Sequence, residues 1–234
     1  MHKQYKFIKF REKLMTVLNF EEARHNMIVQ QIQPWNVRDD KVLDLLQRLP
    51  REDFVPAKYK EHAFTDINIP LENGQEMMSP KLEAYMLQAL QVQEHDKVLE
   101  IGTGTGYVTA LLASQSRHVI TVDIDENMQK RAEEKLNAHQ IKNVTYEVGD
   151  AALGWDNHRP YDVIAITGSL PVLPEVFQRT LAVGGRLFAV VGEAPAMEAI
   201  LITRISETEW THKVLFETSI TALTNAVKPE RFVL

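Results

Sequence analysis

Apolar residues recur along the first third of the chain with the spacing of helices. Residues 20–33 carry one such stripe, and residues 42–49 carry a second, which Pro50 ends. Residues 56–79 show no regular period, and an irregular stretch of this length is typical of a functional loop. Ser79-Pro80 then opens a third helix, because serine suits the cap and proline suits the first helical position.

From residue 97 onward the pattern changes to short apolar strands that alternate with helices. The predicted elements are strand 97–101, helix 107–113, strand 118–122, a helix capped by Asp125, strands 144–148 and 161–166, helix 174–181, a turn at Gly184-Gly185 and strand 186–191. Segments 199–205 and 213–220 have no helix between them and are expected to form an antiparallel hairpin. This order predicts an α/β fold with a doubly wound, mostly parallel sheet, preceded by a helical cap and followed by the hairpin.

The composition is that of one globular domain. The chain has 234 residues, of which 44% are hydrophobic and 25% charged, enough for one sizeable core. Residues 1–14 are basic and poorly patterned, and we expect a lead-in there without ordered structure. Residues 15–234 are expected to form a single domain, with helices and the irregular loop in 15–79 and the sheet in 80–234.

Charge and cysteine content exclude several classes of function. The net charge is −6, the sequence pI is about 5.8, and no Lys/Arg block occurs, which argues against nucleic-acid and anionic-membrane partners. The absence of cysteine excludes disulfides and thiolate chemistry, and the scattered histidines predict no metal site. Without an apolar stretch long enough to span a membrane or to act as a secretion signal, we expect a cytoplasmic protein, either monomer or homodimer.

The most informative stretch is a glycine-rich turn between the first sheet strand and its helix. Gly102, Gly104 and Gly106 lie at the carboxyl end of a strand, where open α/β sheets bind ligands. A dinucleotide fingerprint would place its third glycine at Tyr107, one residue later. Glu100 precedes the turn, where a carboxylate would repel pyrophosphate but tolerate the cationic sulfonium of S-adenosylmethionine. The pattern resembles the glycine-rich motif of class I methyltransferases.

Two later aspartates stand where such a cofactor would need carboxylates. Asp123 ends the second strand and is expected to accept both ribose hydroxyls; the alternative role is helix capping, for which Asp125 is better placed. Asp150 follows the third strand, where the resemblance implies a contact to the adenine amino group; the alternative is an ordinary turn residue. The predicted contacts to S-adenosylmethionine are Glu100, Gly102, Thr103, Gly104, Gly106, Asp123, Ile124, Asp150 and Ala151.

Longer motifs extend the resemblance from about Met27 to Arg186. They are Leu49-Pro50-Arg51-Glu52-Asp53-Phe54-Val55-Pro56, the run 98–112, Val148-Gly149-Asp150, Tyr161-Asp162-Val163-Ile164 and Val183-Gly184-Gly185-Arg186-Leu187. On these segments the chain resembles the protein-L-isoaspartate O-methyltransferases. The resemblance implies methyl transfer from S-adenosylmethionine to L-isoaspartyl residues of damaged proteins or peptides. A free carboxyl with a pKa near 4 is already an anion at neutral pH, so the absence of an obvious catalytic base fits this reaction.

One segment departs from that family. Its substrate loop reads approximately G-Q-T-I-S-x-P, whereas residues 74–80 read Gly-Gln-Glu-Met-Met-Ser-Pro, so that Glu76 replaces threonine and Met78 replaces serine. Ser79 lies one position late and is expected to cap the following helix, with a catalytic contact as the alternative. The predicted substrate-side residues are Gln75, Glu76, Met78, Thr167 and Thr224. The changed loop leaves two alternatives open, a methyltransferase with another small-molecule or protein acceptor and an S-adenosylmethionine-binding protein without turnover.

Overall fold

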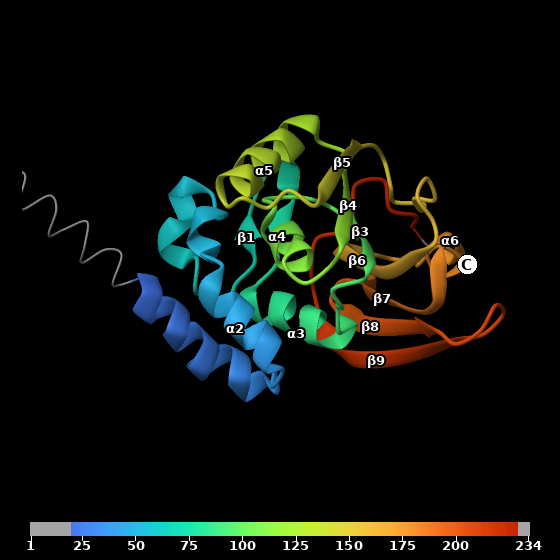
Figure 1. Cartoon of the computed structure of the whole chain (residues 1–234), viewed down its shortest axis with the longest axis horizontal. Helices are drawn as coiled ribbons and strands as arrows, with labels where there is room; N and C mark the ends of the chain where they lie inside the picture. The colour runs from blue at the N-terminus through green and yellow to red at the C-terminus, as the bar shows by residue number, and fades with distance from the viewer. Residues whose placement is uncertain (1–19, 229–234) are drawn as a thin grey trace, which may run out of the picture.

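A seven-stranded sheet runs through the centre of the molecule (Figure 1). The computed structural model describes residues 20–228, so the lead-in predicted at 1–14 lies outside the described residues. In spatial order the strands are β5 (Val144–Val148), β4 (His118–Asp123), β3 (Lys97–Ile101), β6 (Tyr161–Leu170), β7 (Leu181–Glu193), β8 (Ala196–Arg204) and β9 (Trp210–Thr218). The five neighbouring strands β5, β4, β3, β6 and β7 are parallel, while β8 pairs antiparallel with β7 and β9 antiparallel with β8. The predicted sheet and C-terminal hairpin are confirmed.

Alternate residues of the strands point into two separate hydrophobic cores. Val98 belongs to the core beneath the longer helices, and its neighbour Leu99 belongs to the opposite core with Phe177. The first face is covered by α3 (Pro80–Leu90), α4 (Tyr107–Ala113) and α5 (Glu126–Ala138). The second face is covered by the short α6 (Glu175–Arg179) and by loops, because residues 149–160 form no helix between β5 and β6.

The N-terminal cap is helical but less regular than its sequence pattern predicts. Residues 20–27 are α-helical, the chain then widens into the π-helical η1 (Ile28–Ile32), and it tightens into the 3-10 helix η2 (Gln33–Trp35). The next helix, α2 (Asp40–Arg48), begins at Asp39, whose side chain accepts from two backbone N–H groups of the first turn. Both cap helices are therefore confirmed, the first with a break in its period.

The irregular segment 56–79 has more structure than expected. The short helix η3 (Arg51–Asp53) precedes it. The segment itself contains η4 (Ala57–His62), η5 (Glu72–Gly74) and a two-stranded antiparallel ladder of β1 (Ile69–Pro70) and β2 (Glu76–Met77). The ladder places residues 71–76 of the predicted substrate loop beside Gly102, Asp123 and Asp150, at the carboxyl ends of the central strands. The division into 15–79 and 80–234 stays a prediction.

A buried guanidinium connects this cap to the rest of the molecule. Arg51 is fully buried, and it donates to both carboxylate oxygens of Glu83 in α3 at 2.9 and 3.2 Å. Its other N–H groups reach the carbonyls of Ala63 and Met78, each at 2.6 Å. Burial raises the pKa of Glu83, and the charge and hydrogen bonds of Arg51 oppose that rise. One side chain thus connects η3, the loop at Ala63, the substrate loop at Met78 and α3.

Two local predictions are corrected by the structure. Gly184-Gly185 is not a free turn but lies inside β7, at a shift of register against β6, with Gly184 at φ 83°. Ser79 occupies the N-cap position of α3, yet its side chain makes no capping hydrogen bond. Its backbone N–H donates to Asn68 Oδ1 at 3.0 Å, and Ser79 lines a groove with Trp35. The predicted cap position is therefore confirmed, but the capping hydrogen bond is absent.

Removing the Arg51 charge is expected to destabilise the fold strongly. Arg51→Met leaves Glu83 buried without a counter-charge and should lower the free energy of unfolding by about 3–5 kcal/mol in urea unfolding experiments. Arg51→Met combined with Glu83→Met removes both charges and should recover part of that loss. The control Arg179→Met breaks an exposed ion pair with Glu175 and should change little. Additive losses in the double variant would contradict the role of this pair.

Candidate functional site

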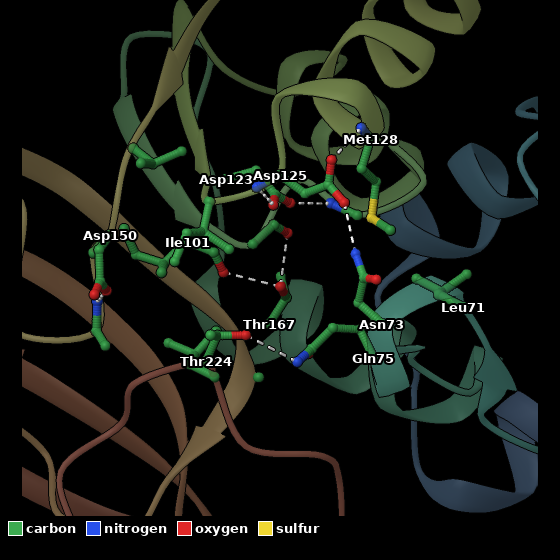
Figure 2. Close-up of a pocket in the computed structure, with 18 of the residues that line it drawn as sticks. Leu71, Asn73, Gln75, Ile101, Asp123, Asp125, Met128, Asp150, Thr167 and Thr224 are labelled. Atoms are coloured by element: carbon green, nitrogen blue, oxygen red, sulfur yellow. Dashed lines mark hydrogen bonds between the residues drawn. The ribbon is translucent and has the colours of Figure 1, made fainter.

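A cavity of about 510 Å³ lies at the carboxyl ends of β3, β4, β5 and β6, where the sequence places the ligand site. Figure 2 shows its walls, which come from segments between Leu71 and Thr224. The sheet contributes Gly102, Gly104, Asp123, Ile124, Asp150, Ala151 and Thr167, and the loops contribute Leu71, Asn73, Gln75, Glu76, Thr221, Leu223 and Thr224. Most of the predicted site residues therefore share one cavity.

The glycine turn follows β3 and forms the floor of this cavity. Gly102 has φ 93°, and a Cβ there would lie 2.4 Å from Thr167 Oγ1, so only glycine fits. The Gly104 N–H donates to Asp123 Oδ2 at 2.9 Å, which ties the turn to the end of β4. Gly106 serves packing instead, since a Cβ there would lie 2.9 Å from Ala132 Cβ of α5. Gly106 does not line the cavity, contrary to its predicted cofactor contact.

Asp123 lines the cavity and also organises its rim. Its Oδ1 accepts from the N–H of Asp125 at 2.9 Å while Oδ2 accepts from Gly104. The helix cap belongs to Asp125, whose Oδ1 accepts from Asn127 and Met128 of α5. Each Asp123 oxygen accepts one backbone hydrogen bond and can accept another, so the carboxylate can still accept hydrogen bonds from a pair of ligand hydroxyls. As the sequence predicts, α5 is capped by Asp125 and not by Asp123.

Two predicted cofactor contacts are buried beneath the turn. Glu100 is fully buried, and its Oε2 accepts from the hydroxyls of Thr109 and Thr121 at 2.6 and 2.7 Å. Thr103 is buried as well, with its hydroxyl 2.7 Å from that of Thr121. Burial raises the pKa of Glu100 to about 8, so this carboxyl is mostly protonated at neutral pH. Glu100 and Thr103 are predicted to contact the ligand, but the structure places neither in the lining of this cavity.

The next part of the wall follows β4 and β5. Ile124 is 46% exposed and lines the cavity, as does the small side chain of Ala151. Asp150 Oδ1 accepts from the N–H of Ala152 at 3.0 Å, and its Oδ2 accepts from Asn225 Nδ2 at 2.7 Å. These residues form an apolar slot beside a carboxylate. A flat ring system that carries an amino group suits such a slot.

Asn73 is a cavity residue that the sequence reasoning missed. Its Nδ2 donates to Asp125 Oδ2 at 2.9 Å and joins the loop to the start of α5 across the cavity (Figure 2). Asn73 has φ 57°, and the Asn73-Gly74 pair is a turn signal in the sequence. The pair predicts a turn, but only the folded chain shows which carboxylate the amide meets.

The predicted substrate-side residues divide into two groups. Gln75 Nε2 lies 3.3 Å from Thr224 Oγ1, and the Thr167 hydroxyl lies 2.9 and 2.8 Å from the carbonyls of Ile101 and Gly102 (Figure 2). These three predicted residues line the cavity, together with Glu76.

The remaining two, Met78 and Ser79, do not line that cavity. Met78 is buried in the core under the loop, and its carbonyl is held by Arg51. Ser79 lines a separate groove of about 270 Å³ with Trp35 and Lys81. The structure therefore places Ser79, the alternative catalytic residue of the sequence prediction, outside the lining of this cavity.

The charges around the cavity have one sign. Six acidic side chains line it, and no lysine or arginine does among the residues that the structure describes; the acidic residues are Glu72, Glu76, Asp123, Asp125, Glu126 and Asp150. Four basic residues line a second cavity beyond Leu71: Lys58, Lys60, Arg131 and Lys135. A pyrophosphate would meet carboxylates and no basic side chain in the cavity wall, whereas a sulfonium nucleoside with an ammonium group would be attracted. The cavity chemistry fits S-adenosylmethionine.

Metal-binding clusters and membrane-spanning helices are also absent from the described residues. Among residues 20–228 no cluster of His, Cys, Asp and Glu could hold a metal ion. Within the same residues no helix has the length and apolar character needed to cross a membrane.

The buried Glu100 carboxyl predicts a pH dependence of stability. Its pKa is 4.5 when unperturbed and about 8 in the fold, so between these values the unfolded chain loses a proton that the folded chain keeps. The free energy of unfolding of the wild type should therefore fall across this window, relative to that of Glu100→Gln. Urea unfolding at several pH values measures the difference. Parallel curves for the two proteins would contradict it, and Glu198→Gln, at an exposed carboxylate, should follow the wild type.

The chain is similar to known proteins over most of its length. The family model described as protein-L-isoaspartate(D-aspartate) O-methyltransferase matches residues 22–228. A protein-L-isoaspartate O-methyltransferase of Magnetococcus marinus is 38% identical over 83% of this chain and 85% of its own. Protein-L-isoaspartate O-methyltransferase 1 of Syntrophobacter fumaroxidans is 36% identical over 80% of this chain and 87% of its own.

Solved structures agree on the fold. One named protein-L-isoaspartate O-methyltransferase has a TM-score of 0.75 at 23% identity and covers 88% of this chain and 67% of that chain. Another, from Plasmodium falciparum, is described as a beta-aspartate methyltransferase in complex with S-adenosyl-L-homocysteine; its TM-score is 0.71 at 18% identity, over 88% and 98% of the two chains. With the family model matching nearly the whole described region, the chain belongs to the protein-L-isoaspartate(D-aspartate) O-methyltransferase family.

Proposed function

We propose that this protein transfers a methyl group from S-adenosylmethionine to the free carboxylate of L-isoaspartyl residues in proteins or peptides. The observation that carries the proposal is the family match over residues 22–228, which spans every wall of the acidic cavity. The relatives that match are named for this reaction. The cavity has the size of a small-molecule site and the charge that a sulfonium nucleoside requires.

Residues from three strands would hold the cofactor. We assign the ribose hydroxyls to Asp123, the adenine amino group to Asp150, and the faces of the adenine ring to Ile124 and Ala151. The backbone of the turn at Gly102 and Gly104 would lie against the remainder of the molecule. When bound there, S-adenosylmethionine supplies an electrophilic methyl group on a positively charged sulfur.

The acceptor side of the cavity needs to position a carboxylate and little else. An aspartyl-type carboxyl has an unperturbed pKa of about 3.9, so at neutral pH it needs no base to remove a proton. Polar side chains of Gln75, Thr167 and Thr224 line this side. Holding the two reactants close and in line lowers the barrier by restricting their motion before reaction. Ser79 and Met78 have no part in this assignment.

A second function keeps the cofactor and changes the acceptor. The observation that favours it is Glu76, an acidic side chain in the cavity wall where the family's loop carries threonine. A cofactor-binding protein without turnover is a third possibility on the same ground. The cytoplasmic location and the choice between monomer and homodimer stay predictions.

Removing the Asp123 carboxylate should weaken cofactor binding. Asp123→Ala loses a hydrogen-bond acceptor for the ribose and the tie to Gly104, so the binding free energy should fall by about 1–3 kcal/mol. Calorimetry with S-adenosylhomocysteine measures this. Asp44→Ala removes an exposed carboxylate of α2 and should bind as tightly as the wild type. Equal affinities for all three proteins would remove Asp123 from the site.

The acceptor is identified by a matched pair of peptides. With a radiolabelled methyl donor, a peptide that contains one isoaspartyl residue should be methylated, and the same peptide with ordinary aspartate should not. The product should be a methyl ester that releases methanol at alkaline pH, which distinguishes it from an N-methyl product. Absence of label despite S-adenosylhomocysteine binding would leave only the other acceptor or the protein without turnover.

A further inference from the structure

Two of the six acidic residues in the cavity form ion pairs. Glu72 pairs with Arg131 at 2.8 Å, and Glu126 pairs with Lys130 at 2.7 Å. The other four, Glu76, Asp123, Asp125 and Asp150, accept hydrogen bonds from neutral groups but have no ion-pair partner within residues 20–228. These four carboxylates therefore set the charge that a ligand meets.

The four carboxylates without an ion pair lie at two ends of the cavity. Asp123 ends β4, Asp125 follows it, and Asp150 follows β5, so these three belong to the end assigned to the nucleoside. Glu76 contacts Thr221, and the Thr221 carbonyl accepts from Ser169 of β6 at 3.0 Å. Strand β3 lies between β4 and β6 in the sheet. Glu76 thus stands across β3 from Asp123, on the side where Thr167 and Thr224 would meet the acceptor.

The Glu76 carboxylate is held firmly in this position. Its Oε1 accepts from the backbone N–H of Thr221 at 2.6 Å and from Asn68 Nδ2 at 3.0 Å. Its Oε2 makes no hydrogen bond to the described residues, and the side chain lines the cavity. Because Oε1 is anchored by a backbone donor, the negative charge cannot swing away when an anionic acceptor enters.

A carboxylate acceptor that enters this end meets a fixed negative charge and, among the described residues, no basic side chain. At a separation of 4 Å even fully hydrated like charges repel measurably, and the repulsion grows as water is excluded. A positive charge carried by the acceptor itself would cancel that repulsion and would find Oε2 of Glu76 unoccupied. We propose that Glu76 selects isoaspartyl acceptors that carry a positive charge, such as an ammonium group, beside the methyl-accepting carboxylate. This inference rests on the proposed function and narrows its substrate class.

Two peptides that differ only in one charge test the proposal. In one, lysine precedes the isoaspartyl residue; in the other, N-acetyl-lysine does, which removes the charge and keeps the length. We expect kcat/KM of the wild type to favour the lysine peptide by about fivefold or more at low salt. Glu76→Gln keeps an oxygen for Thr221 and Asn68 but loses the charge, and should reduce the ratio to less than about twofold.

Controls separate this effect from others. Glu198→Gln removes an exposed carboxylate away from the cavity and should keep the wild-type ratio. Raising the ionic strength should lower the ratio in the wild type, a test that needs no variant. Calorimetry should give Glu76→Gln the same affinity for S-adenosylhomocysteine as the wild type. An unchanged ratio with weaker cofactor binding would assign Glu76 to the cofactor's ammonium group and overturn the proposal.

Different results would contradict this inference and the proposed function. If the wild type methylates the lysine and acetyl-lysine peptides equally well, the charge selection is wrong and the methyl transfer stands. If the wild type methylates neither isoaspartyl peptide while binding S-adenosylhomocysteine, the proposed function itself is wrong.

Discussion

The position of the cavity depends on one buried cation. Arg51 is enclosed between the N-terminal cap and the sheet helices, with its charge met by Glu83 and its remaining N–H groups by the carbonyls of Ala63 and Met78. An uncompensated charge at such depth is strongly unfavourable, so the three segments that supply its partners must close on it together. One of them, the loop that ends at Met78, forms a wall of the cavity. Core packing and the shape of the site are thus coupled through a single side chain.

The parallel sheet explains why residues far apart in sequence meet at this cavity. Parallel strands bring their carboxyl ends to one edge, and each contributes the residue that follows it: Gly102 after β3, Asp123 at the end of β4 and Asp150 after β5. The C-terminal segment closes the same edge, since Ser169 of β6 exchanges backbone hydrogen bonds with Thr221 and Leu223. Asp123 then joins two of these ends by accepting from Gly104.

Periodic segments were predictable from sequence because their pattern is local. Strand β3 and helix α4 have the predicted bounds, and Asp125 caps α5 as expected, since strand alternation, glycine and a capping carboxylate act within a few residues. Features that depend on distant partners were not predictable. The register shift at Gly184-Gly185 arises against β6, and the widening at Ile28 arises in a helix with no local breaker. Ser79 occupies the N-cap position of α3 as its sequence predicts, but its side chain makes no capping hydrogen bond.

The case of Glu100 shows that a correct prediction of the cofactor can start from a residue whose charge the sequence does not reveal. Its position before the glycine turn implies a negative charge beside the ligand, but residue type does not reveal burial. In the fold its carboxyl lies among Thr103, Thr109 and Thr121, where burial raises its pKa to about 8 and favours the protonated form. The negative charge that a sulfonium would meet comes instead from Asp123, Asp125, Asp150 and Glu76. A neutral Glu100 also spares Asp123 the repulsion of a second anion, because the two groups interact electrostatically. The cavity therefore concentrates its charge on carboxylates that face the ligand.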